Sequence, residues 1–282
     1  MTQPAINTVT EQASSVNSTT KPNSQAWYHP TLSHEHGVYL VLLVSFLTGA
    51  ALAHAWTLST TLALVCAFCG FQAEHPIVLQ IKQRRSLKPR FLVWAGLYSA
   101  VSVAIAFWLY LSFPILLWLY VGAIAALVVD AISVFHGEQK SIFNEFITFA
   151  AVCLSAPFAY AATTGSISAT LMGLWVLNTL YFSSTIFTVK LRKTKTSSPI
   201  PGVIYHAIAI LLIATCYYFG WLPLIAALAF GLALLKFAIA ALNQEWYRTA
   251  KIQWVAMLET GTALSFLIIV ALSVLPARLT EL

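Results

Sequence analysis

The feature that most constrains this chain is a succession of long, unbroken apolar stretches between residues 37 and 275. Each is close to the roughly 20 residues that a helix needs to cross the hydrocarbon core of a bilayer. Hydrophobic residues make up 59% of the chain and charged residues only 9%, whereas a soluble domain has about a quarter charged residues. The stretches also lack the alternating pattern of a membrane β-strand. The sequence therefore predicts an all-α, polytopic membrane helical bundle.

Hydropathy and helix breakers predict about nine transmembrane helices in one bundle over residues 34–276. Residues 1–33 are rich in Ser, Thr, Asn and Gln and lack the basic start and short apolar run of a cleavable signal peptide. They are expected to form a disordered cytoplasmic leader, and residues 277–282 a short external tail. The expected spans are residues 37–54, 56–73, 91–111, 114–135, 142–162, 167–189, 202–219, 222–242 and 252–275.

Basic residues test this count, because the cytoplasmic loops of membrane proteins carry an excess of Lys and Arg. They gather in every second predicted connection, and the connections between carry none. This alternation predicts a multi-pass protein of the bacterial cytoplasmic (inner) membrane with its N-terminus in the cytoplasm and its C-terminus outside. The net charge of +6 follows from that topology and from attraction to anionic lipid heads. The bilayer is therefore the expected partner, and nucleic acid is not.

Ionisable side chains inside the predicted spans are candidate functional groups, because placing them in a bilayer is costly. On the predicted topology they fall in the cytoplasmic half of the membrane, which indicates a polar cavity facing the cytoplasm. Asp130 and Glu259 are expected to pair with a basic group, and Lys236 to extend its ammonium to the interface. Positions at headgroup level are an open alternative for the residues at helix ends. The group consists of Glu35, His36, Glu74, His75, Asp130, Glu145, His206, Lys236 and Glu259.

Two short motifs resemble metal or redox sites. Glu35 and His36 are candidates for metal binding, because imidazole and carboxylate groups are common metal ligands. Cys66 and Cys69 have the C-x-x-C spacing of redox sites, but they lie in an apolar span and are expected to be buried thiols without a redox role. No phosphate-binding loop, dinucleotide glycine signature or nucleophile elbow is present in the sequence.

Two polar helix faces that end in basic loops are candidate binding surfaces. Cations at the end of a polar face suit a lipid-borne phosphate or diphosphate, and ordinary basic loops are the open alternative. The first surface comprises Gln72, Glu74, His75, Arg84 and Arg85, and the second comprises Asn178, Tyr181, Lys190 and Arg192.

These residues carry a resemblance to a known family. Glu35-His36-Gly37, the polar end of the second span and the stretch from Tyr181 to Arg192 resemble the YwiC-like membrane proteins. The chain is more distantly similar to the UbiA prenyltransferase superfamily, and this similarity implies a UbiA-like architecture of nine helices with a cavity on the cytoplasmic side. In that superfamily two Asp-rich motifs bind magnesium and a prenyl diphosphate. This chain has a single aspartate, Asp130, so the sequence does not support a magnesium site, and the cofactor is unknown.

The sequence thus predicts a YwiC-like membrane protein whose cavity binds an isoprenoid or quinone-type lipid. One alternative is a divergent prenyl or lipid transferase in which cations hold a diphosphate and Glu74 or Asp130 acts as the acid–base group. Another is a small-molecule or proton-coupled transporter, and a non-catalytic assembly role is also open. The predicted diphosphate-binding cations are Arg84, Arg85, Lys190 and Arg192, and the predicted transport path comprises Asp130, Glu145, His206 and Glu259.

Overall fold

The computed structural model describes residue 31 and residues 36–83, 87–193 and 198–275. The predicted leader, apart from residue 31, and the predicted tail lie outside these residues. So do Glu35, Arg84 and Arg85, and also the side chain of His36.

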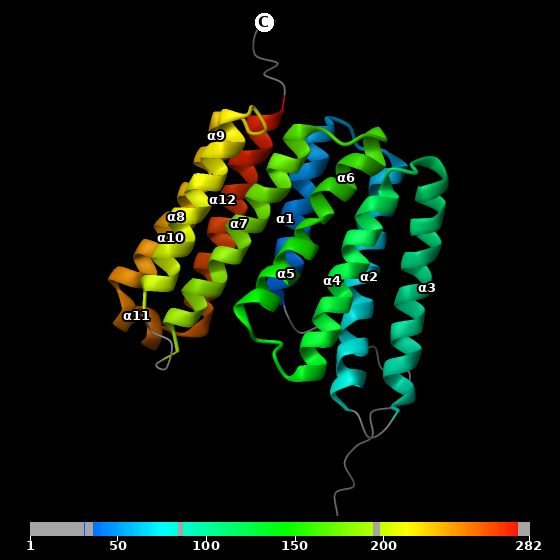
Figure 1. The fold of residues 1–282 in the computed structure, drawn as a ribbon, viewed down its shortest axis with the longest axis horizontal. Coiled ribbons are helices and arrows are strands. Elements are labelled where there is room, and N and C mark those ends of the chain that lie inside the picture. Colours follow the sequence, from blue (N-terminus) through cyan, green and yellow to red (C-terminus); the bar gives the residue numbers. More distant parts are fainter. Residues whose placement is uncertain (1–30, 32–35, 84–86, 194–197, 276–282) are drawn as a thin grey trace, which may run out of the picture.

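The described residues form a bundle of helices that run roughly parallel to one another (Figure 1). The predicted all-α membrane bundle is confirmed: eight helical segments are long and apolar enough to cross a membrane, and α1 is a shorter apolar helix. The helices are α1 His36–Ala53, α2 Leu58–Lys82, α3 Pro89–Ser112, α4 Leu116–His136, α5 Ile142–Cys153, α6 Ser155–Thr164, α7 Ala169–Leu191, α8 Ile200–Tyr218, α9 Leu224–Leu228, α10 Gly231–Leu242, α11 Gln244–Thr249 and α12 Ile252–Val274.

Two predicted spans are each made of two helices. The helices α5 and α6 together form the span Ile142–Thr164, and α9 and α10 form the span Leu224–Leu242. The short helix α11 lies outside the spans, at the end of α10. Most predicted boundaries agree with the helix ends within two residues.

The end of the second span is the exception. The sequence predicts that it stops at residue 73, but α2 continues through Pro76 to Lys82. A proline removes one backbone hydrogen bond and usually kinks or ends a helix. Here Pro76 is buried inside the helix, so packing against neighbouring helices maintains the helical backbone beyond it.

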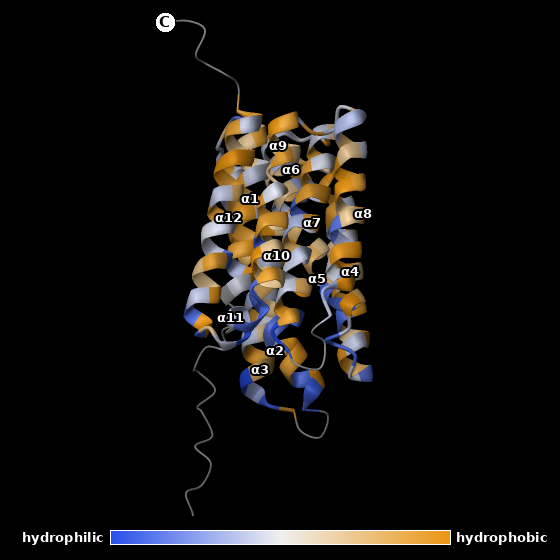
Figure 2. Cartoon of the chain, turned by 90° about the vertical axis from the view of Figure 1, so that its left-hand side faces the viewer, coloured by the Kyte–Doolittle hydropathy of each residue, from blue (hydrophilic) through white to orange (hydrophobic). Residues whose placement is uncertain are grey.

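Consecutive spans run in opposite directions, so the connections alternate between the two ends of the bundle (Figure 1). The described basic residues Lys140, Lys190, Arg192 and Arg248 therefore lie at one end. Figure 2 shows hydrophilic ribbon concentrated at this end and apolar ribbon along the middle of the helices.

The bundle has a central helix and a peripheral one. Among the eight spans, α7 is the most buried and α3 the least. One large apolar cluster packs around α7 with α1, α8, α10 and α12. A second packs α1, α2, α3, α4 and α6 together. These two clusters share α1, and a smaller third cluster packs α7, α10, α11 and α12 together.

Candidate binding cavity

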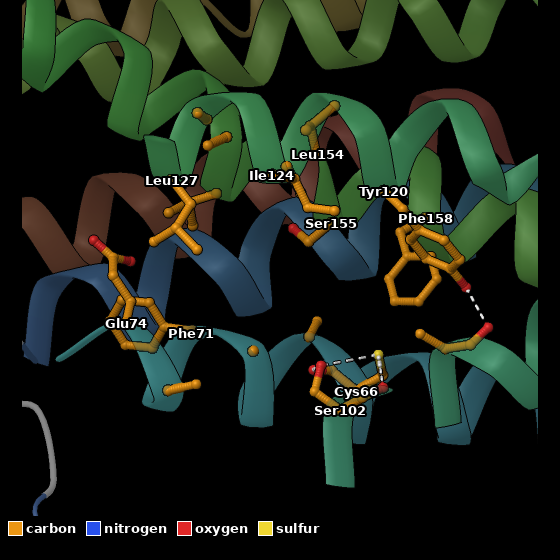
Figure 3. A pocket seen from close by; sticks show the side chains of 18 of the residues that line it. Cys66, Phe71, Glu74, Ser102, Tyr120, Ile124, Leu127, Leu154, Ser155 and Phe158 are labelled. Carbon is orange, nitrogen blue, oxygen red and sulfur yellow. Dashed lines mark hydrogen bonds between the residues drawn. The ribbon is translucent and has the colours of Figure 1, made fainter. Parts of the chain in front are cut away.

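A cavity of about 390 Å³ lies in the region of the second cluster, between α2, α3, α4, α5 and α6. Its lining is mostly apolar, with carboxylate side chains from Glu74 and Asp130. Figure 3 shows Glu74 and Phe71 towards one end and Tyr120 and Phe158 towards the other.

The shape of the cavity follows from helix periodicity. Residues of α2 between Cys66 and Ile77 line it, as do residues of α4 between Leu119 and Asp130. On each helix these residues recur every three or four positions, so they share one face. Eleven steps along an α-helix span roughly 16 Å. Because Gly70 and several alanines leave space on these faces, the result is an elongated cavity along the helix direction.

Asp130 is the most distinctive polar group in the lining. Its side chain is only 7% exposed, and its Oδ1 accepts a hydrogen bond of 2.8 Å from the amide of Asn144. Its Oδ2 is buried and has no hydrogen-bond partner among the described residues. The predicted pairing of Asp130 with a basic group is wrong, because the neutral amide of Asn144 occupies that position.

Sequence reasoning did not identify Asn144 as the partner of Asp130. The turn between α4 and α5 places the last turns of α4 beside the first turn of α5. Ser141 caps α5 by accepting from the backbone N–H of Asn144 at 3.2 Å, and the amide of Asn144 also donates to the carbonyl of Gln139 at 3.2 Å. The short loop between α4 and α5 is the feature of the sequence that could have indicated this contact, because it keeps the end of α4 close to the start of α5.

The other polar groups of the lining are largely used by the protein itself. Five hydroxyl or thiol groups donate to backbone carbonyls within 3.3 Å. These bonds tie neighbouring helices together or close a turn of one helix, so the polar character that remains is concentrated in the carboxylates. The five groups belong to Cys66, Ser102, Tyr120, Thr148 and Ser155.

The other predicted residues on α2 do not line the cavity. The amide of Gln72 donates to the hydroxyl of Tyr39 on α1, and His75 is half-buried. Cys66 and Cys69 are free thiols. Among the described residues, no group of three or more His, Cys, Asp or Glu side chains could hold a metal ion.

A second polar group lies in the region of the first cluster. The ammonium of Lys236 lies 2.8 Å from Oε2 of Glu259 and 3.1 Å from the hydroxyl of Thr185. It also lies over the ring of Tyr181, 5.5 Å from the centroid. The prediction that Glu259 pairs with a basic group is confirmed, whereas the prediction that Lys236 reaches the interface is wrong. The side chain of Lys236 is 1% exposed, because partly buried partners on α7 and α12 satisfy its charge.

The remaining candidates on α7 and α8 make interhelical or local contacts. Asn178 donates to Thr48 at 3.0 Å, the ring of Tyr181 stacks on Phe266, and Nδ1 of His206 lies 2.7 Å from the carbonyl oxygen of Gly202.

At the basic end of the bundle, charged side chains link loops and helices. The ammonium of Lys190 lies 3.3 Å from the carboxylate of Glu145, and Arg192 donates to the carbonyl of Ala250 at 2.6 Å. Nearby, burial raises the pKa of the Tyr247 hydroxyl to about 12, so this group stays protonated at neutral pH.

The structure brings only some of these candidates to one cavity. Glu74 and Asp130 line the cavity of about 390 Å³, but Asn178, Arg192 and Glu259 do not. Helix periodicity predicts the helix face on which each residue lies, but it does not predict which other helix packs against that face.

Comparison with known proteins bears on the same part of the chain. A model of the YwiC-like protein family matches residues 32–160, which confirms the resemblance expected from the sequence over that range. Every residue that lines the cavity falls within it. The searches of curated proteins and of solved structures found no match.

Proposed function

The chain is YwiC-like over residues 32–160, and from this premise we propose that the cavity binds an isoprenoid or quinone-type lipid. The apolar chain lies along α2 and α4, and the polar head lies at Glu74 and Asp130. The observation that carries this proposal is the combination of an elongated apolar lining with carboxylates from two helices.

The size of the cavity suits such a ligand. Pockets for small molecules and cofactors are mostly apolar, with a few placed polar groups, and have volumes of about 300–1,000 Å³. A cavity of about 390 Å³ with a length of roughly 16 Å accommodates a linear chain better than a compact polar metabolite.

The head group must supply most of the selectivity. Moving an apolar chain from lipid into an apolar cavity gains little, because lipid tails are as apolar as the lining. A buried oxygen without a partner, by contrast, gains a full hydrogen bond when a donor reaches it. Oδ2 of Asp130 is such an oxygen, so a head with a hydroxyl group, as in a quinol or an isoprenoid alcohol, fits this position.

A diphosphate head fits less well. It would bring negative charge beside two carboxylates, and the described cations Lys190 and Arg192 contact Glu145 and Ala250 instead. This arrangement favours lipid binding over the transferase that grips a diphosphate with those cations.

The test is to purify the full chain in a mild detergent and to identify the retained lipids by mass spectrometry. Ala126→Phe fills the cavity, since Ala126 lines it. Its neighbour Ala125 is exposed and is not part of the lining, so Ala125→Phe is the matched control. An isoprenoid or quinone-type lipid should be enriched with the wild type and with Ala125→Phe, and lost with Ala126→Phe. Recovery of bulk phospholipid alone from the wild type contradicts the proposal.

A further inference from the structure

Several residues that line the cavity are exposed, and among the large apolar ones Val103 and Ile124 are the most exposed. Val103 of α3 is 66% exposed and Ile124 of α4 is 61% exposed, although both belong to the lining. Side chains that do both mark an opening, which we call the α3–α4 mouth, defined by Val103 and Ile124. The cavity thus opens sideways, between two helices.

The α3–α4 mouth lies deep in the membrane-spanning segments. Val103 is separated by nine or more residues from both ends of α3, and Ile124 by eight or more from both ends of α4. At 1.5 Å per residue, both are roughly 12 Å or more from either end of their helix. The hydrocarbon core of a bilayer is about 30 Å thick, so the mouth faces lipid tails.

The packing of α3 explains why the two helices leave an opening. Towards α2, Ser102 of α3 and Cys66 of α2 donate hydrogen bonds to each other's backbone carbonyls, at 3.1 and 3.3 Å. Gly70 allows this close approach, because a Cβ there would lie 3.3 Å from the Ser102 hydroxyl. Towards α4, Tyr120 donates to the carbonyl of Ala106 at 3.0 Å. Ala106 and Tyr120 lie about one turn closer to the connecting loop than Val103 and Ile124 do, so this bond fastens α3 to α4 on the loop side of the mouth.

We propose that the ligand enters this cavity sideways from the bilayer core, through the α3–α4 mouth, and that its head is uncharged and carries a hydroxyl group. This inference rests on the proposed lipid-binding function and adds the route and the class of head group. The rim is apolar, and a charged head would have to leave its hydration to pass it. A hydroxyl head passes at lower cost and then donates a hydrogen bond to the carboxylate of Asp130, which lines the cavity.

The first experiment uses the full chain in lipid nanodiscs with two probes that share one isoprenoid chain, farnesol and farnesyl diphosphate. Farnesol should bind saturably, and the diphosphate at least about tenfold more weakly, because its negative charge would face the carboxylates of Glu74 and Asp130. Equal affinity for the two probes overturns the head-group assignment. If farnesol fails to bind the wild type, the proposed function itself fails.

The second experiment tests the route. In the double variant Val103→Trp/Ile124→Trp, bulky rings narrow the mouth. The control Val101→Trp/Val121→Trp changes exposed residues of the same two helices that are outside the lining. Farnesol should associate and dissociate at least about tenfold more slowly with the first variant, with a similar Kd, and at wild-type rates with the control. Unchanged rates in the mouth variant overturn sideways access while leaving lipid binding intact.

A smaller substitution guards against disturbed folding of the double variant. Ile124→Cys and Val121→Cys each place one thiol on the exposed part of α4, to be labelled in the bilayer with a membrane-soluble maleimide. Farnesol should protect Ile124→Cys at least several-fold and leave Val121→Cys unprotected, with the unsubstituted chain giving the background from native thiols. Equal labelling of both with and without farnesol counts against a ligand in the mouth.

Discussion

The ammonium of Lys236 lies 2.8 Å from the carboxylate of Glu259, and these two residues join α10 to α12 inside the bundle. Thr185 of α7 contacts both, since it lies 3.1 Å from the ammonium and 3.4 Å from the carboxylate. Three helices are thus held together by one polar contact, at a similar distance from their ends on the basic side of the bundle.

Removing one member of this pair should destabilise the protein. Lys236→Met leaves the Glu259 carboxylate without its charged partner, and breaking a buried pair from one side typically costs about 3 kcal/mol or more. We expect a clearly lower melting temperature in detergent, with Lys140→Met, a change at an exposed loop residue, as the control. The double variant Lys236→Met/Glu259→Met should recover much of the loss, because it leaves no uncompensated charge. A single variant as stable as the wild type would show that the pair contributes little.

The crossing of α1 and α6 should not tolerate a side chain at Gly49. A Cβ at this position would lie 2.0 Å from the backbone oxygen of Ala156, so the two helices would have to separate. Overpacking of this kind costs about 3 kcal/mol, and Gly49→Ala should lower the melting temperature. At Gly261 of α12 a Cβ meets nothing within 4 Å, so Gly261→Ala should be neutral or stabilising by about 0.5–1 kcal/mol. Equal effects of the two changes would refute the close crossing.

Asn144 should hold Asp130 in place for the ligand. Asn144→Ala removes the hydrogen bond to Oδ1 and leaves a buried carboxyl group without that partner, which costs about 1–3 kcal/mol. We expect a lower melting temperature and weaker farnesol binding. Asn243→Ala is the control, because Asn243 is exposed and its amide bonds only to its own helix turn. Loss of binding with Asn243→Ala as well would point to a general folding defect.

The orientation in the membrane is open to a direct measurement. The positive-inside rule leads us to expect that the bundle end carrying Lys140 faces the cytoplasm. Cysteine introduced at Lys140 should be protected from a membrane-impermeant thiol reagent in intact cells, whereas cysteine at Ser166, in the connection between α6 and α7, should react. The reverse labelling pattern would place the basic end outside.

Much of the fold was predictable because each spanning helix is a local property. The length and apolarity of a sequence stretch determine where a helix crosses the membrane. Each crossing moves the chain to the other side, so basic residues gather in every second connection. The end of α2 was not predictable, because local rules stop a helix near a proline, while packing around Pro76 sustains it. Similarly, a lysine in an apolar helix extends to the interface unless neighbouring helices supply partners, and Lys236 has such partners on α7 and α12.

The sequence by itself determined that this chain is a helical membrane bundle, which of its ends is basic, and that Asp130 and Glu74 are candidate site residues. The tertiary structure decided which candidates meet. It brings Glu74 and Asp130 to the lining of one apolar cavity, and it pairs Lys236 with Glu259 in a different part of the bundle. Exposed lining residues of α3 and α4 lie at the proposed opening of the cavity. The physical reason is that helix periodicity specifies the face of a residue, whereas the neighbour of that face depends on how all the helices pack together.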